Sequence, residues 1–188
     1  MKTKIKNICL ALTFLVISSN VNAQKNHTLD PKSTFSVAGT STMHDWEMKS
    51  TGKTTGNSNL TVTDNKLAAI TTISIVLPAE SIKSEKTKMD KIAYETLKTD
   101  KAKNITYTLK SAEKVNETTW NLTGTYTIAG VSKLLKTQVK TTVINGVVTL
   151  EGTQKIKFAE FGMKSPTAML GAIKTGEDLT LKFKASFK

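Results

Sequence analysis

Thr34-Phe-Ser-Val-Ala-Gly-Thr-Ser-Thr-Met-His-Asp-Trp-Glu-Met48 is the stretch from which the fold of this chain can be read. Phe35 and Val37 alternate with small or polar residues, so they share one face of a strand, because successive side chains of a strand point to opposite faces. We expect one strand over about 33–40 and a second over about 42–53. The stretch therefore indicates a β-rich fold.

The second of these expected strands carries the side chains with the most chemistry. On a regular strand His44, Trp46 and Met48 lie on one face, and Asp45 lies on the other. An imidazole and an indole on an apolar face can form a pocket with a polar end. A lone histidine beside an aspartate is more often satisfied by backbone or water than used in catalysis. We therefore interpret this stretch as a candidate binding site.

Alternating apolar residues continue along the rest of the chain and predict about eight to ten antiparallel strands. Further strands are expected over 60–63, 67–77, 104–109, 120–128, 135–144, 147–155, 155–161 and 178–187. Asn145-Gly146 between two β-branched runs predicts a tight hairpin, because both turn positions need positive φ. Residues 24–32 are expected to form a loose lead-in, and residues 165–171 a loop. Evenly spaced strands of this kind predict either a β-sandwich or a closed β-barrel.

One helix is expected, between about Glu85 and Lys98. Met89, Ile92, Ala93 and Leu97 recur at the spacing of one face of an α-helix. Such a helix normally covers the open end of a sheet. A flexible methionine on its apolar stripe can either pack in the core or touch a ligand.

The first 23 residues have the features of a signal peptide. Three lysines precede an apolar segment at residues 8–17, and Val21-Asn22-Ala23 supplies small residues for cleavage after Ala23. The expected mature chain, residues 24–188, has the size of one domain and contains no cysteine, because Cys9 lies in the leader. Disulfides and thiolate sites are therefore excluded from it. We expect a periplasmic or secreted protein.

The formal net charge is +12, and all 27 basic residues are lysines. Proteins that read nucleic acids usually depend on arginine for bidentate contacts, so no nucleic-acid partner is expected. The lysines are spread along the strands, as on a solvated outer face. The charge favours solubility, or weak association with an anionic membrane surface.

The expected inward faces mix large side chains with small ones. Phe35, Trp46 and Tyr107 are among the large residues, and Gly39 and Gly124 are among the small ones. An eight-stranded barrel is just wide enough to be filled by side chains or to hold one small ligand. The pattern leaves both outcomes open. A tunnel with apolar walls and a polar mouth would suit a long hydrocarbon ligand.

Three ordered sets of residues resemble the YceI-like family of exported polyisoprenoid-binding proteins. They are Phe35–Glu47; Leu77–Ser84 with Lys88–Lys91, Tyr94–Lys98 and Asn104–Tyr107; and Leu122–Ser132 with Phe161–Lys164. The resemblance implies an all-β, lipocalin-like extended antiparallel β-barrel of about eight strands with one short inserted helix. It also implies a bound isoprenoid or other amphiphilic lipid. By position it implies ligand contacts by His44, Trp46, Met89, Tyr94, Phe161 and Met163, to which the inward face adds Tyr107.

Three functions are consistent with the sequence. The first is non-enzymatic storage or transport of a hydrophobic lipid, such as an isoprenoid quinone, a polyprenyl chain or a fatty-acid-like amphiphile. The second is a structural or interaction module of the cell envelope with a filled barrel, and in either case two barrels could pair as a homodimer. The third is a hydrolase with His44 as base, helped by Asp45 or Ser41, but Asp45 points away from His44 on a regular strand. No metal-ligand spacing is present, so neither a metal nor a cofactor is expected.

Overall fold

The computed structural model describes residues 25–188, so the expected signal peptide and its cleavage site lie outside the described residues. The strands are β1 (Lys25–Thr28), β2 (Thr34–Ser41), β3 (Trp46–Ser50), β4 (Thr55–Thr63), β5 (Lys66–Pro78), β6 (Ile82–Lys83), β7 (Asn104–Lys114), β8 (Thr119–Ile128), β9 (Val131–Ile144), β10 (Val147–Lys157), β11 (Thr167–Ala168) and β12 (Ile173–Phe187). The helices are α1 (Thr87–Leu97) and the short 3-10 turns η1 (Ala79–Ser81), η2 (Phe158–Phe161) and η3 (Met169–Gly171). Within residues 25–188, no helix is long and apolar enough to cross a membrane.

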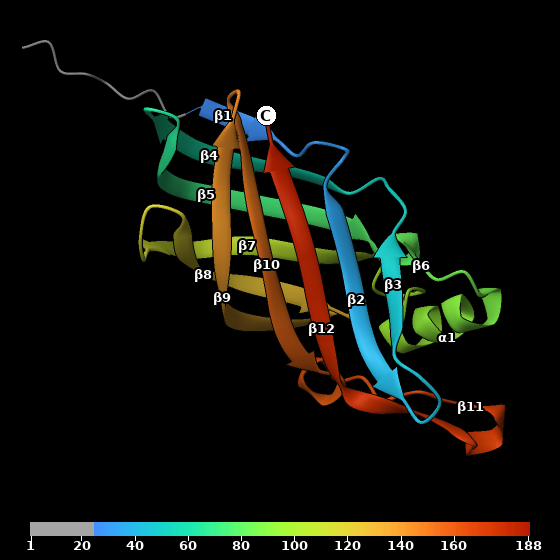
Figure 1. Cartoon of the computed structure of the whole chain (residues 1–188). Coiled ribbons are helices and arrows are strands. Elements are labelled where there is room, and N and C mark those ends of the chain that lie inside the picture. Colours follow the sequence, from blue (N-terminus) through green and yellow to red (C-terminus); the bar gives the residue numbers. More distant parts are fainter. Residues whose placement is uncertain (1–24) are drawn as a thin grey trace, which may run out of the picture.

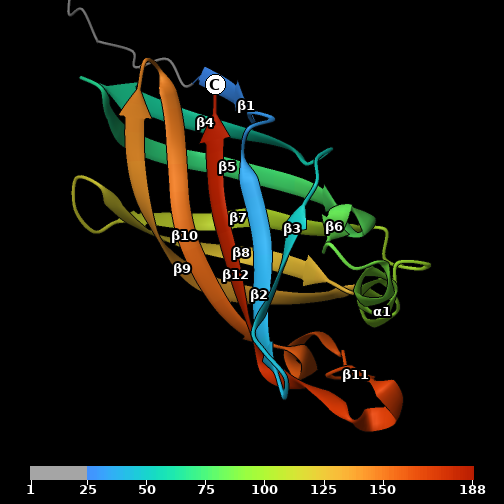
Figure 2. The same cartoon turned by 45° about the vertical axis from the view of Figure 1, so that its right-hand side comes forward.

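All the strands belong to one antiparallel sheet, which curls into a barrel (Figure 1, Figure 2). The hydrogen-bonded order is β1-β4-β5-β7-β8-β9-β10-β12-β2-β3-β6, with β11 paired to β12. Each end of this strand order is tied to another part of the sheet. Leu29, just after β1, bridges to Phe187 at the end of β12. At the other end β6, which follows β5 through η1, pairs with β3. The predicted all-β barrel with one inserted helix is confirmed.

Eight strands have eight residues or more, and β1, β3, β6 and β11 are shorter additions, so the described residues hold more strands than expected. The lead-in was expected to be loose, yet Lys25–Thr28 pairs with β4 and buries His27. Its polar residues lack the alternation that marks a strand, because this short strand depends on backbone hydrogen bonds. The expected strand over 155–161 is also wrong beyond Lys157. The chain turns there through η2 and ends that turn at Gly162, whose φ is +62°.

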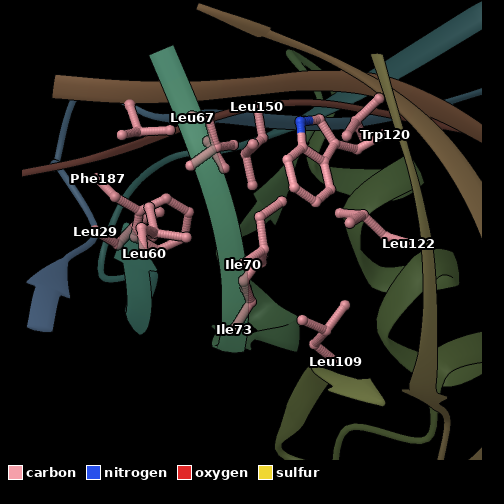
Figure 3. Close-up of a cluster of buried hydrophobic side chains, with 13 residues drawn as sticks. Leu29, Leu60, Leu67, Ile70, Ile73, Leu109, Trp120, Leu122, Leu150 and Phe187 are labelled. Atoms are coloured by element: carbon pink, nitrogen blue, oxygen red, sulfur yellow. The ribbon is translucent and has the colours of Figure 1, made fainter. Parts of the chain in front are cut away.

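One half of the barrel interior is filled by a hydrophobic core. Figure 3 shows side chains from β4, β5, β7, β8, β10 and β12 pointing toward one another in this cluster. Its members are Leu29, Leu60, Leu67, Ile70, Ile73, Leu109, Trp120, Leu122, Val139, Val148, Leu150, Ala185 and Phe187. Phe187, which lies beside Leu29 and Leu60 in this cluster, is 0% exposed. Burial of an aliphatic or aromatic side chain contributes roughly 1.5–3 kcal/mol, so this half supplies much of the stability of the fold.

Candidate functional site

The other half of the barrel interior holds a second hydrophobic cluster, around Ile156, Phe158 and Phe161, and is only partly filled. A cavity of about 330 Å³ lies between the strand walls and α1. Its strand walls are Val37, Trp46, Met48, Ile128, Ile156 and Leu179, and the segment around η2 adds Phe158 and Met163. Cavities that bind small molecules typically measure roughly 300–1,000 Å³, so this one is large enough for a compact ligand or part of a longer chain.

Helix α1 forms one wall of this cavity. The predicted stripe of Met89, Ile92, Ala93 and Leu97 faces the space, and each of these side chains is only half-buried. A helix that covered a filled core would bury such a stripe completely. The helix therefore covers the open end of the sheet, as the sequence predicts, but it covers a hollow.

Hydrogen bonds on the other side of α1 hold the helix in place. The carboxylate of Asp90 is buried and accepts bonds from the backbone N–H and the hydroxyl of Ser84, at 2.7 and 2.8 Å. The Tyr94 hydroxyl donates to the carbonyl of Glu80 at 3.0 Å, and the Thr99 hydroxyl donates to the Glu80 carboxylate at 2.9 Å. Polar contacts therefore fix the helix, while its apolar stripe stays free to contact a ligand.

The charged side chains in the cavity lining are both lysines. Lys86 and Lys88 lie at the start of α1, and His44, on the loop before β3, also lines the cavity. Among the described residues that line the cavity, none is acidic. The mouth therefore combines a positive, hydrogen-bonding edge with an apolar interior. This arrangement fits a molecule with an apolar body and an anionic or polar head.

His44 lies in a turn and not on the expected regular strand, because β3 begins only at Trp46. Ser41 organises this turn: its hydroxyl donates to the carbonyl of His44 at 2.8 Å and accepts the N–H groups of Met43 and His44. The imidazole Nδ1 lies 2.7 Å from the backbone oxygen of Asp45. Neither the Ser41 hydroxyl nor the Asp45 carboxylate makes a bond to the ring that an acyl-transfer relay would need.

A second cavity, of about 120 Å³, lies farther along the same strand faces toward the filled half. Three of its lining residues stand two positions along a strand from residues of the main cavity: Phe35 from Val37, Tyr126 from Ile128, and Leu181 from Leu179. Residues two apart on a strand point the same way. The hollow half of the barrel therefore narrows gradually toward the core.

Comparison with known proteins places this barrel in a family. The family model described as "YceI-like domain" matches residues 18–187. The chain belongs to the YceI-like domain family. No curated protein matches the chain.

Solved structures with the same YceI-like fold support this assignment. Burkholderia cenocepacia BcnA matches with a TM-score of 0.69 at 16% identity, covering 84% of this chain and 98% of BcnA. A polyisoprenoid binding domain from Saccharophagus degradans matches with a TM-score of 0.68 at 13% identity, covering 86% and 97%. Campylobacter jejuni YceI protein matches with a TM-score of 0.58 at 18% identity, covering 99% and 97%. At these identities the structures show the fold alone.

The YceI-like barrel brings four of the seven expected site residues to the main cavity, which are His44, Trp46, Met89 and Met163. Tyr107 lines the second cavity instead. Their contact with a ligand stays a prediction.

The remaining two expected residues, Tyr94 and Phe161, do not line either of these cavities. Tyr94 stands five residues after Met89, a rotation of about 140° around the helix, so it points away from the stripe. Lys83 Nζ lies 5.3 Å above its ring. Phe161 is fully buried in the packing around η2. The expected loop over 165–171 is wrong at Thr167–Ala168, which forms β11 and pairs with β12 because backbone hydrogen bonds, not an apolar pattern, make this hairpin. Ala168 and Ile173 of the hairpin line the main cavity.

Tyr107 places a polar atom inside the apolar barrel. Its hydroxyl is buried and has no hydrogen-bond partner among the described residues. Its ring packs edge-on against Tyr126 at 4.9 Å, and the Tyr126 hydroxyl is bonded to Thr137 at 2.8 Å. Burial raises the pKa of Tyr107 well above its usual value near 10. Gly124 makes this position possible, since a Cβ there would clash with the Tyr107 ring.

Replacing Tyr107 with phenylalanine is expected to raise the free energy of unfolding by about 1 kcal/mol, because an unpaired buried hydroxyl is lost. The variant should also lose less stability in alkali. A tyrosine whose folded pKa is raised releases its proton first in the unfolded chain, so stability falls as pH rises above about 10. Urea unfolding at pH 7 and pH 10.5 measures both effects. A variant less stable than the wild type at pH 7 would show that the hydroxyl has a partner.

Proposed function

We propose that the protein binds one amphiphilic lipid, with the apolar chain in the main cavity and the head group at the mouth beside Lys86 and Lys88. The unfilled apolar cavity between the strand walls and α1 is the observation that carries this proposal. Removing ten methylenes from water contributes roughly 8 kcal/mol at about 0.8 kcal/mol each, before the cost of association. Binding of useful strength is therefore attainable without a dense network of polar contacts.

The chemistry of the lining narrows the ligand class. Apolar walls select a hydrocarbon chain, and the lysines with His44 select an anionic or hydrogen-bonding head. A prenyl phosphate or a fatty acid satisfies both requirements, and a quinone satisfies the first. The polyisoprenoid binding domain with the same fold supports an isoprenoid chain. The size of the cavity favours a short chain, or one end of a long one.

The expected setting of this activity is the cell envelope. The features of residues 1–23 support export to the periplasm or the medium, where a carrier could shield a hydrophobic molecule from water. Pairing of two barrels stays a prediction. The turn at Ser41 and His44 lacks the bonds of a catalytic relay, and among residues 25–188 no group of three or more potential metal ligands occurs. These observations favour binding over hydrolysis, and the hollow half argues against a purely structural barrel.

Native mass spectrometry of the exported protein, followed by organic extraction, tests the proposal. We expect a complex with a mass excess from one bound molecule, and its extract should contain an apolar-chain compound. Stripped protein should then take up a farnesyl phosphate or palmitate probe at a ratio of one to one. Protein that carries no extractable lipid and takes up neither probe would contradict the proposal.

A charge variant tests the position of the head group. Replacing Lys86 and Lys88 together with glutamine is expected to weaken binding of farnesyl phosphate about tenfold, because the charge-assisted contacts are lost. Binding of farnesol, which has the same chain without the phosphate, should change little. The matched control replaces Lys110 and Lys184, which are also exposed but lie on the barrel wall. Equal losses for the two ligands would place the head group elsewhere.

A further inference from the structure

Two apolar residues protrude from the tip of the β11–β12 hairpin. Met169 is 74% exposed and Leu170 is fully exposed. Both have left-handed backbone conformations, with φ of +49° and +56°, and Gly171 follows with φ of +90°. Consecutive non-glycine residues with positive φ are uncommon. This turn therefore displays two large apolar side chains to the outside instead of packing them.

The hairpin tip stands at the mouth of the main cavity. Ala168 and Ile173, the pair next to the tip, both line that cavity. The β2–β3 loop is hydrogen-bonded to the hairpin through Thr42 N–H and the carbonyl of Lys174, at 3.0 Å. That loop adds Met43, which is 67% exposed and also lines the cavity. Both views show the β11 hairpin projecting from the end of the barrel near α1 (Figure 1, Figure 2).

Exposed lysines accompany these apolar residues. Lys86 and Lys88 stand on the α1 side of the mouth, and Lys164 and Lys174 stand on the two sides of the hairpin. Within residues 25–188, none of the four forms an ion pair with a carboxylate. Lysines of the barrel wall do form such pairs, as Lys136 does with Glu113 at 3.1 Å. The mouth therefore carries four lysines that are not neutralised by carboxylates, close to the protruding apolar residues.

We propose that the mouth docks on an anionic membrane surface, with Met43, Met169 and Leu170 inserted among the lipid head groups and the lysines on the phosphates. Isolated protruding apolar side chains beside basic ones are typical of proteins that lie at a bilayer interface. A protein partner would instead require roughly 800 Å² of complementary surface on each side, which a narrow hairpin tip does not offer.

This docking surface goes beyond the proposed lipid binding and does not depend on it. If both hold, the mouth of the cavity faces the bilayer, and an amphiphile can pass between bilayer and cavity without its chain crossing water. Transfer of an apolar chain through water is costly, because every CH₂ that becomes exposed loses its favourable burial. The orientation would therefore raise the rate of loading more than the affinity.

Flotation with lipid vesicles tests the docking surface. Exported wild-type protein is expected to bind vesicles of phosphatidylglycerol and phosphatidylethanolamine, and to bind pure phosphatidylcholine vesicles at least tenfold more weakly. The double variant Met169→Ser with Leu170→Ser should bind the anionic vesicles at least tenfold more weakly than the wild type. Salt at 0.5 M should weaken the binding of wild type, since the Debye length falls below about 5 Å.

A matched control distinguishes binding by the hairpin tip from non-specific adsorption of exposed apolar side chains. Val115→Ser with Ile144→Ser removes two other exposed apolar residues, in the β7–β8 and β9–β10 hairpins. This control should bind the anionic vesicles like the wild type. All variants have the same N-terminal segment, so a difference in vesicle binding between the tip variant and the control reports the hairpin tip alone. Equal vesicle binding by the tip and control variants would overturn the docking proposal, and so would equal binding to anionic and neutral vesicles. Uptake of a farnesyl phosphate probe in detergent, measured in parallel, reports the lipid-binding proposal separately and should be unchanged in the tip variant.

Discussion

Phenylalanine in place of Ala93 is expected to reduce lipid binding by more than a hundredfold while the barrel stays folded. Ala93 lies on the stripe of α1 that faces the main cavity. A phenyl group there occupies space that would otherwise hold about four or five carbons of the ligand, which forfeits roughly 3–4 kcal/mol at about 0.8 kcal/mol each. Overpacking usually costs stability in a filled core, but here the new ring enters a hollow.

Isothermal titration with the farnesyl phosphate probe and thermal melts of the stripped protein measure both consequences. The stripped Ala93→Phe variant should melt at or above the temperature of the stripped wild type, because the ring buries apolar surface in the cavity. The matched control is Ala68→Phe, which adds the same ring at an exposed position of β5. Unchanged lipid affinity in Ala93→Phe would show that the ligand site lies outside this cavity.

The parts of the fold that the sequence predicts are those where one strand or helix carries its own pattern. Residues of β8 alternate between half-buried and buried along the whole strand, and this alternation is visible as every second residue from Trp120 to Ile128. Asn145 and Gly146 both have positive φ, as the hairpin requires. The stripe of α1 falls on the cavity side. Each of these features depends on local periodicity, which the sequence displays directly.

The features that the sequence did not predict depend on contacts between distant segments. The pairing of β1 with β4, the bridge from Leu29 to Phe187 and the pairing of β6 with β3 secure the ends of the sheet. They depend on backbone hydrogen bonds, which leave no side-chain pattern. Phe161 and Met163 are two residues apart and are buried in the same cluster, yet only Met163 also lines the cavity. The turn at Gly162, which ends η2, lies between the two residues and sets the different directions of their side chains. Whether the barrel is hollow also depends on how side chains from many strands meet, which no single stretch records.

Phe187→Ala, in the filled half of the barrel, is expected to cost more folding stability than Trp46→Ala, at the cavity. Phe187 is 0% exposed and packs in the core, so its truncation should lower the free energy of unfolding by about 3–5 kcal/mol. Trp46 is half-buried, lines the cavity and donates one hydrogen bond, to the carbonyl of Thr40 at 3.0 Å. Its ring packs on Gly39 and against the cluster around η2, but part of it faces the cavity, so its truncation should cost only about 1–2 kcal/mol.

Lipid binding should be affected in the opposite order, more by Trp46→Ala than by Phe187→Ala. A saturating lipid stabilises the folded protein by RT ln(1 + [L]/Kd), about 2.7 kcal/mol at a hundredfold excess over Kd. Phe187→Ala should keep this gain, because the ligand does not touch the filled half. Trp46→Ala should lose about half of it if Kd rises tenfold, which lowers the gain by about 1.4 kcal/mol. Urea unfolding of stripped and loaded protein measures all four values. If Trp46→Ala instead matched the stability loss of Phe187→Ala and kept the full lipid gain, the indole would be a core residue and the ligand would have to bind elsewhere.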